Sequence, residues 1–257
     1  MTWEVLRRDA APIVLDGGLA TELERRGVDI TGPLWSARAL IEAPQAIEQL
    51  HRDYFAAGAD CCTSASYQAS YEGFQSLGLS HEEATRQIIR SVDLVCAARD
   101  RFHREHAGRQ LFVAASVGPY GAMLHDGSEY HGRYGVSRNA LNAFHAERLA
   151  VLSESGADVL ACETIPSLEE ASVLIELLEQ HSTRDAWISF TSRDGEHTAH
   201  GEPLIDCARA IDRSENVMAV GVNCLRPTLV LGAIRNLRAA TDKAIVVYPN
   251  SGEEWDA

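Results

Sequence analysis

The stretch VMAVGVNC, residues 217–224, is apolar and rich in β-branched residues until it ends abruptly in Asn223 and Cys224. Such a run predicts a strand that is buried on both faces and presents polar side chains at its carboxyl end. The stretch ADVLACET, residues 157–164, has the same form and carries Glu163 near its end. The two stretches predict parallel strands that bring reactive side chains to one edge of a sheet.

The same pattern recurs along the chain, with helical periodicity between the apolar runs. Helix 167–181 is predicted from its apolar stripe, with Ser167 and Glu170 as a capping box. The segment that begins at Ser80 has the same pattern, with Glu83 three residues later. The five other strand candidates are PIVLDGG (12–18), ADCCTSASY (59–67), LFVAASVGPY (111–120), AWISFT (186–191) and AIVVYPNSG (244–252).

This alternation predicts an α/β fold with a parallel sheet and outer helices. A doubly wound sheet and a (β/α)₈ TIM-type barrel are the two candidates. No G-x-G-x-x-G follows the first run, and the polar residues lie at carboxyl strand ends, where barrel active sites form. We therefore predict a single barrel domain over residues 1–257. Seven runs are one short of eight, so we expect the eighth strand and helix to be missing, or another element or chain to close the gap by self-association through the open edge.

The chain has 257 residues, of which 46% are hydrophobic, and a formal net charge of −14. This charge disfavours nucleic acid and anionic membranes as the main partners. We expect no secretory signal and no membrane-spanning segment. The six cysteines lie mostly in apolar runs, which indicates buried free thiols and a reducing, cytoplasmic setting.

Asp16, Gly17 and Gly18 follow the first apolar run. Successive glycine N–H groups can hold a carboxylate, and Asp16 offers a negative charge to an ammonium group. The alternative is an ordinary strand-to-helix turn with a polar cap.

Glu163 and Cys224 are the other two candidates. Glu163 could bind an amino group or act as an acid or base, or it could pair with a structural arginine. Cys224 could bind zinc or act as a nucleophile, or it could be a small core residue. The pair Cys61–Cys62 is interpreted as core. A Schiff-base lyase is rejected because Lys243 precedes the seventh run and belongs to the opposite face.

Two loops carry weaker signals. Residues 124–134, LHDGSEYHGRY, could form a lid over a substrate or an ordered surface loop. The pair His197 and His200 has a metal-chelating spacing, although a solvated loop is the simpler interpretation.

Taken together, these segments resemble the homocysteine S-methyltransferase family, and most closely its bacterial branch that uses S-methylmethionine. The matching stretches run in order from residue 13 to the end of the chain: LDGGLATELERRG, LWSARALIEAPQAI, TSASYQAS, SVGPYGAMLHDGSEYHGRY, LACETIP, GVNC and VVYPNSGE.

The resemblance implies a TIM barrel in which zinc binds the homocysteine sulfur, and the resulting thiolate takes a methyl group from a sulfonium donor to give methionine. It implies that Cys224 is a zinc ligand and that Asp16, Glu163 and the Gly17–Gly18 region hold homocysteine. Asn223 and Asn250 are further expected pocket residues. S-methylmethionine and S-adenosylmethionine remain open as donors, and selenium compounds remain open as acceptors.

One departure from the family pattern suggests an alternative to an active enzyme. The family's other zinc ligands form a Gly-Gly-Cys-Cys motif at the eighth strand, which the printed sequence does not contain. Cys224 alone does not make a site with three protein ligands. The alternative to the enzyme is therefore a truncated, non-catalytic barrel that keeps the amino-acid pocket.

Overall fold

The computed structural model describes residues 12–30, 34–106 and 108–251. The chain divides into two compact units. Unit 1 comprises Met1–Ser116 with Val151–Leu160, and unit 2 comprises Val117–Ala150 with Ala161–Ala257. The single domain expected from the sequence stays a prediction, and each unit is described by itself.

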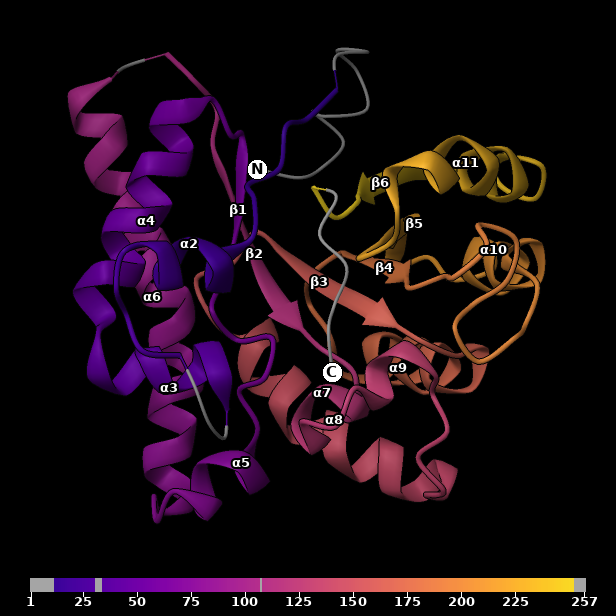
Figure 1. Ribbon diagram of the computed structural model, residues 1–257, viewed down its shortest axis with the longest axis horizontal. Coiled ribbons are helices and arrows are strands. Elements are labelled where there is room, and N and C mark those ends of the chain that lie inside the picture. Colours follow the sequence, from indigo (N-terminus) through magenta and orange to yellow (C-terminus); the bar gives the residue numbers. More distant parts are fainter. Residues whose placement is uncertain (1–11, 31–33, 107, 252–257) are drawn as a thin grey trace. The chain divides into compact units, whose positions relative to one another are not determined.

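Unit 1 packs helices against two strands, coloured indigo to magenta in Figure 1. Its longest helix, α6, opens with the predicted capping box, because Ser80 Oγ accepts from Glu83 N and the Glu83 carboxylate accepts from Ser80 N. The elements are α2 (Leu19–Arg25), α3 (Trp35–Glu42), α4 (Pro44–Ala57), β1 (Cys61–Thr63), α5 (Tyr71–Ser76), α6 (His81–Glu105) and β2 (Phe112–Val117).

Unit 2 continues the alternation of strand and helix. Two of its elements, α8 and β3, extend over the boundary into unit 1. The elements are α7 (Tyr120–Leu124), η1 (Ser128–Tyr130), α8 (Arg138–Ser153), β3 (Val159–Ile165), α9 (Leu168–His181), β4 (Ala186–Phe190), α10 (Leu204–Asp212), β5 (Val217–Asn223), η2 (Pro227–Leu229), α11 (Val230–Arg238) and β6 (Ala244–Tyr248).

The six described strands follow one another in the sheet in chain order, from β1 to β6. The pairs β1–β2, β4–β5 and β5–β6 are parallel. All six residues of β2 and all five of β4 are buried, as predicted for strands covered on both faces.

The first predicted strand, residues 12–18, is wrong as a full strand. Within the described chain it is an isolated parallel bridge between Leu15 and Cys61. Side chains replace the ladder on both sides of this bridge: Val14 N donates to the Asp60 carboxylate, and Thr63 N donates to the Asp16 carboxylate. Pairing therefore stops after one residue, and β1 is only three residues long.

The capping box predicted at Ser167 is half formed. Ser167 Oγ accepts from Glu170 N at 3.2 Å, as expected for a helix N-cap. The Glu170 carboxylate does not return to Ser167; it is fully buried and binds other groups of unit 2, as described below. The residue that matched a local capping pattern is used for tertiary structure instead.

Gly221 lets β5 and β6 approach each other closely. A Cβ atom built at Gly221 would lie 1.8 Å from the carbonyl oxygen of Val246, its partner in the β5–β6 register. Only glycine fits this contact. None of the helices in the described part of the chain has the length and apolar character needed to span a bilayer.

Candidate functional site

The candidate residues form two groups, one in each unit. In unit 1, Asp16 lies directly after the bridge at Leu15, where its N–H donates to the Cys61 carbonyl at 3.0 Å. Its carboxylate accepts from Thr63 N at 2.8 Å and from Thr63 Oγ1 at 3.2 Å. These bonds fix the orientation of the Asp16 carboxylate at the end of β1.

Gly17 and Gly18 are exposed, and the tyrosine of α4 packs against them. A Cβ atom at Gly17 would lie 2.9 Å from Tyr54 Oη, so a side chain there would displace the tyrosine ring. Tyr54 Oη donates to the Gly18 carbonyl at 3.2 Å. Burial, followed by the negative charge of Asp16, raises the pKa of Tyr54 to about 12, so the phenol stays protonated and remains a donor.

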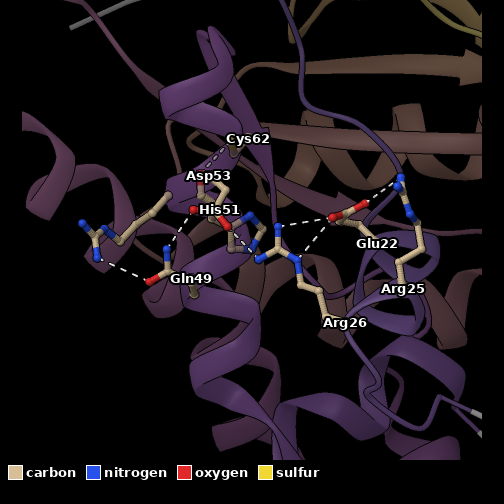
Figure 2. Close-up of polar contacts among 8 residues, drawn as sticks. Glu22, Arg25, Arg26, Gln49, His51, Asp53 and Cys62 are labelled. Atoms are coloured by element: carbon tan, nitrogen blue, oxygen red, sulfur yellow. Dashed lines mark hydrogen bonds and ion pairs between the residues drawn. The ribbon is translucent and has the colours of Figure 1, made fainter.

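Asp16 has two further neighbours that the sequence reasoning missed. The ligand atoms of Asp16, His51 and Cys62 all lie within 4.8 Å of one another. His51 projects from α4 and is fully buried, and burial lowers its pKa to about 4, so the imidazole is neutral at pH 7. The Cys62 thiol donates weakly to the main-chain oxygen of His51 at 3.8 Å (Figure 2).

In unit 2, Asn223 connects the ends of three strands. Its Oδ1 accepts from Thr164 N and from Ser189 Oγ, each at 2.8 Å. Its Nδ2 donates to Thr164 Oγ1 at 2.7 Å and to Cys224 Sγ at 3.3 Å. All four hydrogen-bonding positions of this buried amide are therefore used within the protein.

Thr164 and Cys224 share an unusual backbone. Their φ angles are +59° and +50°, in the left-handed region that residues other than glycine rarely adopt. Thr164 Oγ1 also lies 3.7 Å from Cys224 Sγ. The hydrogen bonds of Asn223 hold both residues in this conformation, and strain of this kind concentrates at functional sites.

The surroundings keep the Cys224 thiol protonated. Desolvation raises the pKa of Cys224 to about 11, and the hydrogen bonds from Thr164 and Asn223 offset part of this rise. The negative charges of Glu163 and Glu129 raise the pKa further. These two carboxylates belong to different elements, Glu163 to β3 and Glu129 to η1.

Glu163 is half-buried, whereas the other six residues of β3, including Cys162, are buried. A hydrogen bond to Glu163 is among the causes that raise the pKa of Tyr248, after burial and the Glu163 charge. Asn250 lies two residues after β6, and its N–H donates to the Leu225 carbonyl at 3.0 Å. Glu163, Asn223, Cys224 and Asn250 thus all belong to the ends of strands in unit 2.

The loop 124–134 is anchored at its base rather than free. Glu170 Oε1 accepts from Tyr120 N at 2.6 Å and lies 2.9 Å from His145 Nε2, while Oε2 accepts from Tyr134 Oη at 3.0 Å. Arg193 also donates to the Tyr130 carbonyl at 2.9 Å. These contacts favour the ordered loop over a hinged lid.

The remaining weak candidates have ordinary partners. His197 Nδ1 lies 2.9 Å from Asp194, and His200 Nδ1 lies 2.9 Å from Glu202, so each imidazole pairs with a separate carboxylate. The Lys243 ammonium donates to the carbonyls of Ser214 and Val217, at the start of β5. This position confirms that Lys243 is at the end of the strands opposite to Cys224.

Comparison with known proteins identifies the family. The family model described as homocysteine S-methyltransferase matches residues 13–257. The chain belongs to the homocysteine S-methyltransferase family. The resemblance predicted from the ordered motifs is confirmed, and the chain is a member of a family of methyltransferases.

Individual members of the homocysteine S-methyltransferase family are closely similar. Homocysteine S-methyltransferase YbgG of Bacillus subtilis (strain 168) is 49% identical, over 95% of this chain and 79% of its own length. A selenocysteine Se-methyltransferase of Brassica oleracea var. italica is 43% identical, over 98% of this chain and 77% of its own length.

A solved structure extends the comparison to the fold. The metallated form of the homocysteine methyltransferase MmuM from Escherichia coli is 45% identical, covers 97% of this chain and 87% of its own, and superposes with a TM-score of 0.92. This match confirms the predicted α/β fold of the TIM-barrel type.

The described residues hold one candidate group of metal ligands. Within residues 12–30, 34–106 and 108–251, the only group of three or more potential His, Cys, Asp or Glu ligands is Asp16, His51 and Cys62. Around Cys224, the described chain supplies no such group. The zinc that the family resemblance implies at Cys224 therefore has one protein ligand there among the described residues.

Proposed function

We propose that this protein transfers a methyl group from a sulfonium donor to the sulfur of L-homocysteine. S-methylmethionine is the first candidate for the donor, and S-adenosylmethionine is the second. The observation that carries the proposal is the thiol of Cys224, held at the end of β5 by Asn223 and Thr164 in a strained backbone. This arrangement occurs in a chain that is 49% identical to a named homocysteine S-methyltransferase.

The reaction needs alignment more than acid–base chemistry. The homocysteine sulfur attacks the methyl carbon, the bond from that carbon to the donor sulfur breaks, and a neutral thioether leaves with the electron pair. The proton of the homocysteine thiol leaves before the attack, since an ordinary thiol has a pKa of about 8.5 and the thiolate is the nucleophile. Holding the two sulfur atoms and the methyl carbon in line is the main task of the protein.

The substrate contacts are proposed residue by residue. Asp16 is oriented by Thr63 and offers its charge to the homocysteine ammonium, and the N–H groups at Gly17 and Gly18 suit its carboxylate. Glu163 is proposed as a second contact for the amino group. Asn250 is proposed to line the pocket.

Asn223 is proposed to act on the pocket indirectly, by positioning Thr164 and Cys224. Its own amide has no free hydrogen-bonding position for a substrate. Zinc is the proposed cofactor, with Cys224 as one ligand. When bound, the ion would supply a thiolate at neutral pH. Self-association through the open edge of the barrel and a cytoplasmic location stay predictions.

The direct test is an assay of the purified 257-residue protein with L-homocysteine and each sulfonium donor, with methionine measured by chromatography. We expect turnover with S-methylmethionine and at least a 1000-fold loss in Cys224→Ser, roughly the scale at which a group essential to catalysis acts. Cys96→Ser is the matched control, since Cys96 is also a partly exposed free thiol and lies on α6. Full activity of Cys224→Ser would contradict the role of this thiol. If homocysteine binds but neither donor reacts, the non-catalytic alternative is correct.

A second prediction concerns Glu163. We expect Glu163→Ala to raise the KM for homocysteine by roughly 10- to 100-fold, because a hydrogen bond to a charged group contributes about 1.5–3 kcal/mol. Its metal content should not change. Glu169→Ala, on the exposed face of α9, serves as the control and should leave KM unchanged. Loss of metal in Glu163→Ala would show that Glu163 is a ligand instead.

A further inference from the structure

His51 is an unexplained group in the core of unit 1. Its side chain is fully buried, and neither Nδ1 nor Nε2 has a hydrogen-bond partner within the described residues. A buried polar atom without a partner costs about 1–3 kcal/mol, so a native protein normally supplies one. Two such atoms on one ring point to a group that the described part of the chain does not supply.

Three different segments bring ligands to this position. His51 comes from α4, Cys62 from β1 and Asp16 from the turn after the Leu15 bridge, and their ligand atoms lie within 4.8 Å of one another. Figure 2 shows His51 and Cys62 next to each other, with the network of Glu22, Arg26 and Asp53 nearby. Imidazole nitrogen, thiolate sulfur and carboxylate oxygen together suit zinc-like ions, whereas magnesium and calcium prefer oxygen ligands alone.

We propose that Asp16, His51 and Cys62 form a metal site for a thiophilic divalent ion such as Zn²⁺, separate from Cys224. An ion at 2.0–2.3 Å from each ligand would place the three ligand atoms roughly 3.5 Å from one another. The Asp16 carboxylate is already oriented by Thr63 N and Oγ1, which act as outer-shell donors. Binding converts the Cys62 thiol to a thiolate and releases one proton to solvent.

The site has a consequence for substrate binding, and this corollary rests on the proposed function. Asp16 is the carboxylate proposed to receive the homocysteine ammonium, so a cation bound at Asp16 neutralises it. We therefore expect excess Zn²⁺ to raise the apparent KM for homocysteine. The metal site itself is tested without any assay of activity, so that failure of the proposed function leaves its test intact.

The test is a titration of the full chain with Co²⁺, followed by the thiolate-to-cobalt absorption band and by equilibrium dialysis. It is done in the Cys224→Ser background, so that this thiol does not contribute. We expect about one Co²⁺ per chain with a thiolate band in that background. Adding Cys62→Ser should remove the band and weaken binding by at least 10-fold.

Cys61→Ser in the same background is the matched control. Cys61 is a buried cysteine of the same strand, adjacent to Cys62, but it is not one of the three ligands. It should leave the band and the affinity unchanged. His51→Gln provides a second variant, which keeps the proposal testable if Cys62→Ser does not fold, and it should also weaken binding at least 10-fold. Absence of Co²⁺ binding in the Cys224→Ser background, or an unchanged band in both ligand variants, would overturn the proposal.

Discussion

At the scale of single residues, Asn223 contributes more hydrogen bonds to the site than any of its immediate neighbours. Its amide serves Thr164, Ser189 and Cys224 at the same time. An isolated asparagine in a buried strand would be costly, but a fully satisfied one specifies the positions of all its partners. The thiol of Cys224 is therefore placed by a neighbour rather than by its own side-chain packing.

Removing the Asn223 amide should destabilise the fold. In Asn223→Ala, Thr164 N and Ser189 Oγ lose their acceptor, and we expect the free energy of unfolding to fall by about 2–4 kcal/mol. Urea denaturation checks this. Asn216→Ala is the comparison, because Asn216 is half-buried and its side chain donates one bond, to the Leu178 carbonyl at 2.9 Å. A loss in Asn223→Ala no larger than that in Asn216→Ala would show that the network is dispensable.

At the scale of elements, the contact between β5 and β6 depends on the missing side chain of Gly221. Alanine at this position would place a methyl group 1.8 Å from Val246 O, so the strands must separate. We expect Gly221→Ala to lower the free energy of unfolding by more than about 3 kcal/mol, in the range of severe backbone clashes.

Gly232→Ala is the matched opposite. Gly232 lies inside α11, where a Cβ atom would meet nothing within 4 Å. Because alanine favours helix by about 1 kcal/mol, this variant should be slightly more stable than the parent protein. Thermal melts of the two variants test this prediction. Equal changes in Tm would mean that the close approach of β5 and β6 at Gly221 does not constrain the residue at this position.

Some elements could be predicted from the sequence and others could not, for physical reasons. The runs that end in Glu163 and in Cys224 form strands because burial on both faces leaves a local, readable pattern. The run at residues 12–18 has the same composition, yet it makes only a bridge because distant carboxylates, those of Asp16 and Asp60, take the donors that a ladder would use.

Two residues, His51 and Glu170, could not be assigned their roles from the sequence, for different reasons. His51 lies on the buried side of α4 near Leu50 and Ile47, and a single histidine on an apolar stripe was its only sequence signal. Its neighbours Asp16 and Cys62 come from other segments, so no short pattern joins them. Glu170 matched a capping box, and only the fold shows that its carboxylate binds His145 and Tyr134.

At the scale of the whole molecule, the buried network of Glu170, His145 and Arg148 predicts how the free energy of unfolding depends on pH. Arg148 donates to His145 Nδ1 at 3.1 Å, so the neutral ring carries its proton on Nε2 and donates to Glu170. Burial lowers the pKa of His145 below its usual 6.5, although Glu170 opposes this shift.

The unfolded chain therefore binds a proton at His145 more readily than the folded chain does. The stability contributed by the neutral ring is present above about pH 6.5 and is lost as the pH falls below this value. We expect the free energy of unfolding at pH 5.5 to be lower than at pH 8, and His145→Gln to reduce this difference. His103→Gln, on the half-exposed side of α6, should retain it. Identical pH profiles for His145→Gln and the parent protein would refute the assignment.

The left-handed backbone at Thr164 and Cys224 also has a consequence for reading other sequences of this family. Glycine or asparagine would adopt this conformation at a cost lower by about 1–2 kcal/mol per residue, so mutational drift without selection for activity is biased towards them. A relative that carries glycine or asparagine at both positions lacks the thiol of Cys224 and should not transfer methyl groups. In genome surveys, such a pair of substitutions therefore marks family members that have lost the methyltransferase activity.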